Sequence, residues 1–407
     1  MPKVVLGLRI SRTPHRLGFE GNEAASARHP EAARAGRSLR ERKPEKRMEV
    51  GMQPQLPYAP ALKDMAEAAP TFRSSEDVGL SEEVAQALLE TKPLKRLAGI
   101  GFLGAIDYAL RRGSGRDPHR RRHNRREHSI GVARLAEVYA LHAGMGGRER
   151  RTLVCAALLH DVGHGPLSHT LEPVFKERFG MDHHRMTRAV IEGTTRFGPE
   201  IRDVLERCGV GCEEVLALID GEDIGDHSFL FSAPINIDTL EGISRCRAFL
   251  GLGRGPAFGA AVRRWATSGR PPRNDFDDFW LLKDSVYGLA INAPLGRRLD
   301  AVAQSYMATC PERFGPDDFL KTGRGFRKAH PDLFRYLEIV PVCGDDLQSR
   351  LPRSWLDVDV TVSDRKFFVD DRVDLVDNDD IFARYRQTRD CRSVKLGQLV
   401  EGQGYGQ

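Results

Sequence analysis

The chain has no long hydrophobic run, and this absence is the first constraint on its class. No stretch of the 407 residues approaches the ~18 consecutive apolar residues that a membrane-spanning helix needs. The N-terminus lacks the apolar core of a signal peptide, and Glu20, Glu23 and Glu31 disfavour an organellar transit peptide. We therefore expect a soluble cytoplasmic protein with no membrane partner.

Cysteine is sparse and follows no disulfide or metal-binding spacing. The seven cysteines are odd in number and include no CxxC pair. Secreted disulfide frameworks normally use an even number, and zinc knuckles use closely paired cysteines. The pattern indicates reduced thiols in a cytosolic protein.

Excess charge is also confined to one segment. The formal net charge is +5, but the first 47 residues contain 12 Lys and Arg against 5 Glu, and the remainder is nearly balanced. A basic nucleic-acid-binding fold is therefore not indicated. Residues 1–75 are rich in Arg, Ala, Glu and Pro and predict a disordered segment, with a nucleic-acid-binding arm as the alternative. Met48 or Met52 is an alternative start.

The first informative feature that is present is a polar pair at the end of an apolar helix. Residues 153–159 form an apolar run that ends at His160 and Asp161, and Gly163 and Pro166 then stop the helix. Such a pair is costly to bury unless something compensates it, and a divalent cation compensates both groups. The pattern predicts a metal site.

A second polar phrase, NRREHS, lies on an earlier predicted helix. His128 precedes Val132, Leu135 and Tyr139, which recur at the 3.6-residue period of a buried helix face. His128 is therefore expected to point inward. Packing of the two helices would bring it to His160 and its neighbouring carboxylate.

The order H, then HD, then a distant D is similar to the ligand signature of the HD-domain metal-dependent phosphohydrolases. The words NRREHSIGV and HDVGHGPLSH more narrowly resemble the deoxynucleoside triphosphate triphosphohydrolase branch, and the likeness covers roughly residues 88–308. It implies a divalent metal held by His128, His160, Asp161 and Asp238. Two imidazoles and two carboxylates suit Mn, Fe, Co, Ni, Mg or Zn, and the sequence does not choose among them.

The last ligand, Asp238, lies at the start of a predicted helix. Asn236 is a candidate cap, and Asp238, Glu241 and Arg245 share one helix face. An Asp favoured there only by the helix dipole is the alternative. The apolar approach at residues 234–237 favours the ligand role, because it predicts that the carboxylate is buried.

Acid–base residues are expected in the segment that follows the HD pair. His164 and His183 are the candidates for moving protons, together with Asp161, because imidazole titrates near neutral pH. The resemblance aligns His183 with the catalytic histidine of the family and leaves His184 where an acid usually stands. His169 is predicted to contact substrate or to support the turn.

Substrate binding is expected from cationic and phenolic side chains. Eight arginines lie between Arg111 and Arg126, and this stretch either rims the site or forms a solvated loop. The resemblance gives Arg125 a phosphate contact, and it places Arg245, Lys283 and Tyr287 near the pocket. For the last two, a surface Lys beside a core Tyr is the alternative.

The positions that recognise the sugar depart from the family. The deoxynucleotide enzymes use a Gln, a Tyr and an Asp, where this chain has Phe102, Gly242 and Cys246. The resemblance therefore implies a phosphohydrolase of a nucleotide-type ester, releasing a deoxynucleoside and tripolyphosphate from dNTPs, with an altered sugar side. The expected partner is a small phosphorylated molecule.

Other functions stay open at this point. A phosphomonoesterase or phosphodiesterase acting on a nucleoside monophosphate or an oligonucleotide would use the same metal. A non-catalytic nucleotide-binding scaffold would not need a full ligand set. A di-iron oxygenase would need extra ligands, for which the available histidines are His164, His169, His183 and His184.

The expected fold is mostly α, an HD-domain helical bundle over residues 80–310 with a small α+β appendage over residues 311–400. Alternating apolar and polar residues predict short strands at 339–344, 354–362 and 365–376. An acidic run at 370–380 matches no motif. Homo-oligomerisation is expected from the resemblance alone.

Overall fold

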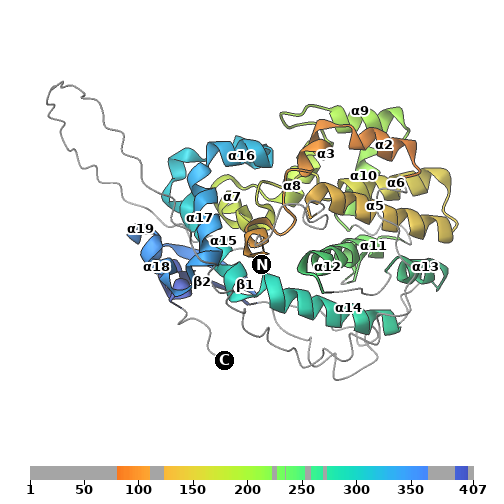
Figure 1. Cartoon of the computed structure of the whole chain (residues 1–407). Helices are drawn as coiled ribbons and strands as arrows, with labels where there is room; N and C mark the ends of the chain where they lie inside the picture. Colours follow the sequence, from red (N-terminus) through yellow and green to blue (C-terminus); the bar gives the residue numbers. More distant parts are fainter. Residues whose placement is uncertain are drawn as a thin grey trace, which may run out of the picture. The chain divides into compact units, whose positions relative to one another are not determined.

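The computed structural model describes residues 80–110, 123–221, 227–233, 235–252, 258–268, 273–364 and 390–401. Within these ranges the chain is helical apart from one two-stranded sheet, so the mostly α prediction is confirmed (Figure 1). None of the helices there has the length and apolar character needed to cross a bilayer. The predicted disordered segment 1–75, the run 370–380 and most of the Arg-rich stretch lie outside the described residues.

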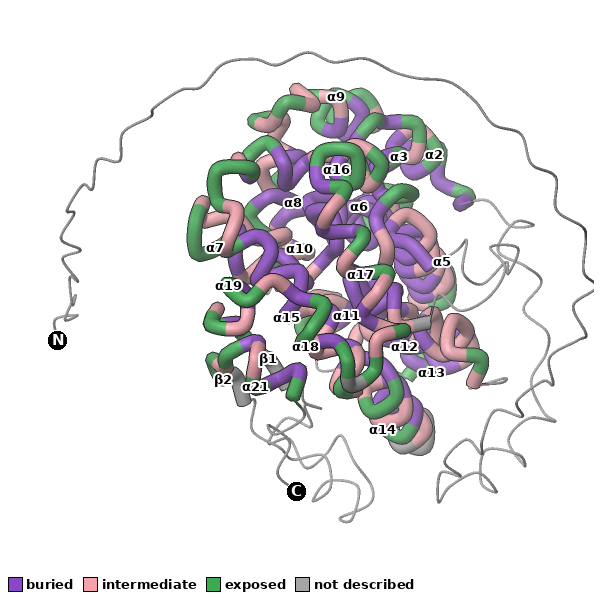
Figure 2. The backbone as a smooth tube through the Cα atoms, turned by 60° about the vertical axis from the view of Figure 1, so that its left-hand side comes forward, coloured by how far each residue is buried: buried purple, intermediate pink, exposed green. Residues whose placement is uncertain are grey.

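The two helices that carry the polar phrases pack along each other at the centre of the described part. They are α5 (Arg125–His142) and α6 (Gly147–Leu159). Every residue of α6 from Thr152 onward is buried, and His160 is its C-cap. Figure 2 shows the tube purple beside the α6 label. The helices packed on this pair include α2 (Glu83–Leu89), α3 (Lys92–Leu97), α10 (Cys212–Ile219) and α13 (Phe258–Ser268), and α9 (Glu200–Arg207) packs on α2 and α10.

The predicted inward face of α5 is confirmed. His128, Val132 and Tyr139 are all buried, as the helical period requires. Asn124 begins the helix because its side-chain oxygen accepts a hydrogen bond from the backbone N–H of Glu127 at 3.0 Å. This cap places His128 one turn from the start of α5.

The turn after α6 is held by a threonine from a later helix. This turn is followed by the short helix η2 (Ser168–Thr170) and then by α7 (Glu172–Phe179) and α8 (His183–Ile191). The Thr187 hydroxyl donates to the backbone oxygen of His160 at 3.1 Å and accepts from the N–H of Gly163 at 3.0 Å. A Cβ at position 163 would lie 2.1 Å from the Thr187 nitrogen, so only glycine fits there.

The fourth predicted ligand stands on α12 (Ile237–Leu250), which packs against α5 and α14 (Arg273–Val286) (Figure 1). Asn236 caps α12 as predicted, because its side-chain oxygen accepts a hydrogen bond from the backbone N–H of Thr239. The Thr239 hydroxyl in turn accepts one from the backbone N–H of Asn236. A short α11 (Phe229–Ser232) precedes it, and a π-helix, η3 (Tyr287–Ile291), continues α14.

The C-terminal elements pack on α15 (Pro294–Thr309), which also contacts η1 (Gly104–Leu110). Strand β1 (Asp359–Asp364) pairs antiparallel with β2 (Asp390–Lys395), and the Gln304 side chain exchanges hydrogen bonds with the backbone of Thr361. The other helices of this region are α16 (Gly323–Ala329), α17 (Pro331–Cys343), α18 (Leu347–Arg350), α19 (Arg353–Leu356) and α21 (Leu396–Val400).

The predicted strand at 339–344 is wrong, because residues 339–343 form the last turns of α17. Leu333, Leu337 and Val340 recur at helical spacing and bury one face, which outweighs the local β-branched content. The second predicted strand is partly confirmed: residues 354–356 belong to α19, and β1 begins at Asp359. The third, at 365–376, lies outside the described residues.

Candidate metal centre and histidine cluster

Three of the four predicted ligands converge on one point. The Nε2 atoms of His128 and His160 are 3.3 Å apart, and Oδ1 of Asp238 lies 2.9 Å from the first and 3.7 Å from the second. One donor atom from each residue falls within 4.8 Å of the others. Helices α5, α6 and α12 thus bring together residues that are far apart in the sequence.

Asp161 faces the same point with one of its oxygens. Its Oδ2 lies 3.5 Å from Nε2 of His128 and 3.6 Å from Nε2 of His160. A divalent ion with bonds of about 2.0–2.2 Å holds its ligand atoms roughly 3 to 3.5 Å apart. The donor types and spacings therefore fit such an ion, and we refer to these four residues as the ligand set.

The ligand set is open on one side only. The His128 side chain is fully buried and that of Asp161 is 7% exposed, whereas the Asp238 side chain is 46% exposed. The expected burial of Asp238 is therefore wrong. Its apolar neighbours Ile235 and Ile237 are buried, but the carboxylate in the first turn of α12 points out of that contact. A substrate would approach on this side.

The charges of the ligand set stabilise one another. Burial lowers the pKa of His160, but Asp161 and Asp238 outweigh it and raise that pKa to about 9. Burial raises the pKa of Asp238, and hydrogen bonds from His128 and His160 lower it below its usual range. The carboxylates thus supply negative charge that a cation can neutralise.

A carboxylate supports the first ligand from behind. Oε2 of Glu241 lies 2.5 Å from Nδ1 of His128, so the other ring nitrogen, Nε2, faces the ligand set. Arg245 pairs with Glu241 and donates to the Glu127 carbonyl at 2.7 Å. A Cβ at Gly131 would lie 2.3 Å from Oε1 of Glu241, so this glycine allows the close approach of α12.

The predicted substrate residue Arg245 thus occupies a supporting position, and its contact with substrate stays a prediction. Glu241 was not predicted to have a functional role. Its signal was present, because it lies on the same helix face as Asp238, three residues later. Carboxylates that hold the second nitrogen of a ligating histidine are a general feature of metal sites.

Arg125 holds Asp161 in place. Its NH1 donates to Oδ2 of Asp161 at 2.6 Å, its Nε to the Ser168 hydroxyl at 3.1 Å, and its NH2 to the Phe102 carbonyl at 3.0 Å. The guanidinium is buried, and its carbon lies 4.6 Å from the centre of the Phe102 ring. In this structure Arg125 positions a ligand, and the predicted phosphate contact is untested.

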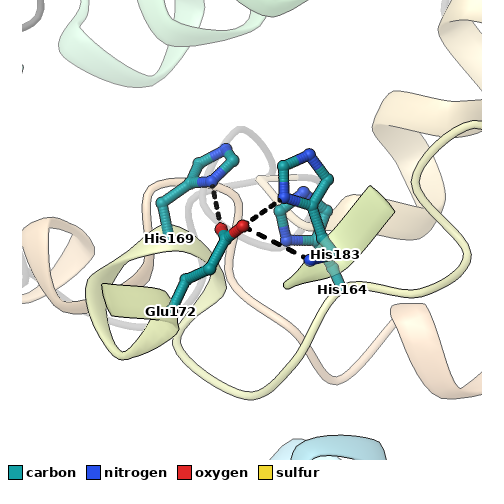
Figure 3. Close-up of side chains that lie close together, drawn as sticks. All are labelled: His164, His169, Glu172 and His183. Carbon is teal, nitrogen blue, oxygen red and sulfur yellow. Dashed lines mark hydrogen bonds and ion pairs between the residues drawn. The ribbon is translucent and has the colours of Figure 1, made fainter. Parts of the chain in front are cut away.

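A second group of donors, the histidine cluster, lies beside the ligand set and consists of His164, His169, Glu172 and His183 (Figure 3). The Glu172 carboxylate lies between two rings, 2.9 Å from Nδ1 of His169 and 2.7 Å from Nδ1 of His183. The ring of His164 stacks on that of His183 with centroids 4.3 Å apart. The predicted acid–base residues are therefore neighbours.

The two groups are joined through one carboxylate. Oδ1 of Asp161 lies 3.1 Å from Nε2 of His164, while its Oδ2 faces the ligand set. Burial, and then the charge of Arg125, lower the pKa of His164 well below its usual range, so this imidazole is neutral. Burial raises the pKa of Glu172, but hydrogen bonds and charge from His169 and His183 outweigh this effect. The net result is a pKa below the usual range of a carboxylate, so Glu172 is ionised.

Glu172 is a second functional candidate, besides Glu241, that sequence reasoning missed. It begins α7 three residues after His169, and only the fold brings it to His183, eleven residues later. His184, in contrast, is exposed beside the cluster and is not one of its four donors.

Lys283 is buried on α14, whereas Tyr287 is partly exposed, so the alternative of a surface Lys beside a core Tyr is wrong. The ammonium lies 5.1 Å from the ring centre of Trp280 and 5.6 Å from that of Tyr287. Burial lowers the pKa of Lys283 to about 8, and the charge of Asp238 partly offsets this effect. Substrate contact by this pair stays a prediction.

The three altered sugar positions are buried together. A Cβ at Gly242 would lie 3.1 Å from the tip of the Phe102 ring, and Cys246 is 1% exposed one turn further along α12. The Phe102 ring also packs against His128, with centroids 4.6 Å apart. The apolar ring of Phe102 therefore covers one side of the His128 imidazole.

A model of the HD domain family matches residues 125–221, which carry three of the four residues of the ligand set. The chain contains an HD domain. Such domains typically bind divalent metals through His and Asp side chains, which agrees with the ligand set described above. Asp238 lies beyond the matched segment, and only the packing of α12 on α5 brings it to the HD domain.

Two proteins from Bacillus subtilis are similar to part of the chain. The uncharacterized protein YwfO is 29% identical over 175 residues, which are 41% of this chain and 37% of YwfO. The uncharacterized protein YdhJ is 31% identical over 134 residues, which are 33% of this chain and 35% of YdhJ. The chain thus matches only about a third of the length of either relative.

A solved structure resembles more of the chain. A hypothetical protein from Aquifex aeolicus superposes with a TM-score of 0.50 at 18% sequence identity, over 69% of this chain and 82% of that one. At this identity the likeness supports the fold alone, and it extends well beyond the HD domain.

Proposed function

We propose that the chain is a metal-dependent phosphohydrolase acting on a nucleotide-type phosphate ester, with deoxynucleoside triphosphates as the first candidate substrates. The observation that carries the proposal is the convergence of two imidazoles and two carboxylates that is open at Asp238. The HD domain supports metal-dependent hydrolysis, and the narrower words NRREHS and HDVGHGPLSH support the nucleotide class.

The ligand set would hold the ion, and Glu241 and Arg125 keep its members in position. When bound, a divalent ion lowers the pKa of a coordinated water and neutralises charge on phosphoryl oxygens. Hydrogen bonds to His128 and Asp161 orient these two ligands before any ion arrives. Such preorganisation spares the site reorganisation during the reaction.

The histidine cluster would handle protons. Because Glu172 lies within hydrogen-bond distance of Nδ1 of both His169 and His183, it orients both rings so that Nε2 of each can face a substrate. The His169 side chain is 33% exposed and can reach a leaving oxygen. Neutral His164 joins this cluster to Asp161, so proton transfer and metal binding lie next to each other.

The substrate would bind between this cluster and α14. Because its pKa is about 8, Lys283 is positively charged at neutral pH. Its charge interacts with that of Asp238, the ligand at which the set is open. Phe102, Gly242 and Cys246 offer none of the polar groups that the resembled enzymes use for the sugar. Discrimination among sugars is therefore expected to be weak.

The test is a substrate screen with purified full-length protein over dNTPs, NTPs, nucleoside monophosphates and a short oligonucleotide, each with Mn²⁺, Co²⁺, Ni²⁺ or Mg²⁺. Phosphate colorimetry and chromatography identify the products. Asp161→Ala is the inactive comparison, and Asp203→Ala, an exposed aspartate on α9, is the matched control.

Tripolyphosphate and a deoxynucleoside, formed by wild type and Asp203→Ala but not by Asp161→Ala, are the expected result. Release of inorganic phosphate from other esters with dNTPs untouched would move the substrate class to the phosphomonoesterase or phosphodiesterase alternative. If the protein binds nucleotides but hydrolyses none of them with any of the four metals, the enzyme hypothesis is rejected in favour of a non-catalytic binding scaffold.

A further inference from the structure

We propose that the histidine cluster is a second binding site for a divalent transition metal of the zinc class, separate from the ligand set, and that an ion there blocks acid–base catalysis. The juxtaposition of three imidazoles and one carboxylate carries the metal site. The blocking effect rests on the proposed function, whereas the binding does not.

The donor set of the cluster has the composition that zinc prefers. His164, His169, Glu172 and His183 come from the turn after α6, from η2, and from the first residues of α7 and α8. One donor atom from each lies within 4.8 Å of the others. Zinc sites in proteins are four-coordinate and commonly combine imidazole nitrogens with a carboxylate oxygen. Hard ions such as Mg²⁺ prefer oxygen ligands and are expected to bind here weakly.

The spacing around Glu172 is nearly that of a metal site already. Its oxygens lie 2.9 Å from Nδ1 of His169 and 2.7 Å from Nδ1 of His183 (Figure 3). Ligand atoms of a tetrahedral zinc ion are roughly 3.3 Å apart, because each bond is about 2.0–2.1 Å. In these two pairs, an ion that replaces the shared protons therefore requires the donor atoms to move apart by roughly half an ångström.

His164 supplies an atom that the protein leaves without a hydrogen bond. Its side chain is 1% exposed, and Nδ1 has no hydrogen-bond partner among the residues that the structure describes. Buried polar atoms without a partner are rare and call for an explanation such as an ion. Parallel stacking of this ring on His183, at an interplanar angle of 8°, holds the imidazole of His164 beside the other members of the cluster.

The scaffold around the cluster is rigid enough to favour binding. The Asp182 side chain caps α8 by accepting from the N–H of Arg185 at 2.9 Å, and the N–H of His183 donates to Glu172 at 3.3 Å. Thr187, on the same helix, ties α8 to the HD turn. Ligands on helix ends that are already fixed lose little conformational entropy when the ion binds.

The site is distinct from the ligand set but touches it. Asp161 directs Oδ2 to the ligand set and Oδ1 to Nε2 of His164. The two sites are therefore expected to fill with different affinities. Removal of one set of donors should leave the other ion bound, because the two groups share no donor among the described residues.

Metal stoichiometry tests the site without any substrate. Full-length protein is stripped with a chelator, equilibrated with Zn²⁺ and analysed by elemental mass spectrometry. Wild type is expected to hold two zinc ions per chain, and Glu172→Gln and His183→Ala one each. His160→Ala should keep the cluster ion. His142→Ala, an exposed histidine on α5, is the matched control and should hold two.

Cobalt gives a second readout, because four-coordinate Co²⁺ absorbs visible light strongly while six-coordinate Co²⁺ does not. The band assigned to the cluster should be absent from Glu172→Gln, whose thermal unfolding serves to show that it is folded. One zinc ion in wild type, or two in both Glu172→Gln and His183→Ala, would overturn the proposal.

The blocking effect is tested on the Mn²⁺-loaded enzyme with its best substrate from the screen. Added Zn²⁺ should lower kcat at least tenfold as the second site fills, and a zinc chelator should restore it. Full turnover with the second site occupied would remove the blocking role. If no substrate is turned over, the proposed function fails, and the stoichiometry alone decides the site.

Discussion

The ligand set and the histidine cluster are built from the same residue types, and in both a carboxylate contacts Nδ1 of a histidine, but they differ in where that carboxylate lies. In the ligand set Glu241 holds Nδ1 of His128 from behind, so Nε2 points at the metal position. In the cluster Glu172 takes Nδ1 of His169 and His183 on the inner side. In the first arrangement the carboxylate lies behind a single ring, and in the second it lies between two rings and is itself one of the four donors. The position of the carboxylate therefore distinguishes a supporting partner of a ligand from a member of the donor group.

The largest expected effect comes from breaking the ligand set. His160→Ala removes one of two imidazoles and should abolish tight Mn²⁺ binding at this site and lower kcat/KM by at least about 10³-fold. Metal content and turnover are measured on the same preparation. Wild-type activity in the alanine variant would show that the ligand set is not the reaction centre.

Breaking the cluster instead should separate chemistry from metal binding. Glu172→Gln keeps the size of the side chain but removes the carboxylate that orients the rings of His169 and His183. We expect kcat to fall by about 10²–10⁴-fold, the usual contribution of acid–base catalysis, with Mn²⁺ affinity at the ligand set unchanged. A variant that loses Mn²⁺ as well would contradict the division between the two groups.

A smaller effect is expected from the support behind His128. Glu241→Gln should weaken metal binding by about 10–100-fold, because the second partner of a ligating histidine fixes its orientation and basicity. Isothermal titration with Mn²⁺ measures the change, and Glu213→Gln on α10 is the matched control. An unchanged affinity would make Glu241 a packing residue only.

The smallest effect concerns a buried histidine outside both groups. His330 is 1% exposed and stacks on Phe314 with centroids 4.1 Å apart. Burial lowers its pKa and outweighs the nearby charge of Asp318. The unfolded chain therefore takes up this proton first, so the free energy of unfolding falls as the pH drops below about 6.5.

His330→Phe removes this proton-linked loss, although it changes the stability at pH 7 as well. Between pH 7 and pH 5 the variant should lose less stability than wild type, because position 330 then has no imidazole whose pKa is lowered by folding. Urea unfolding at both pH values measures the difference, with His142→Ala as the control. Equal losses in variant and wild type would show that His330 is not responsible for the acid sensitivity.

Periodicity and motif spacing were sufficient for the central helices and for three of the ligands. The burial of His128 followed from Val132, Leu135 and Tyr139, and the position of His160 followed from the end of an apolar run. Local rules failed at residues 339–343, where β-branched content suggested a strand. The buried face of α17 extends from Leu333, so a wider window was needed.

Burial of single polar residues was harder to predict than their identity. Asp238 is more exposed than its apolar neighbours suggested, and Lys283 is more buried than its charge suggested. Both outcomes depend on how α12 and α14 face the helices of the HD domain. Sequence periodicity tells which residues share a face, but not what covers that face.

The candidate residues and the helices that carry them could be predicted from the sequence alone, because helix caps, hydrophobic periodicity and turn residues act over a few positions. The partners of Glu172, Glu241 and Arg125 could not, because each contact joins segments between 11 and 113 residues apart. Those contacts decide which nitrogen of each histidine is available. The types of functional group in the candidate site could therefore be identified from the sequence, whereas their arrangement depends on tertiary packing.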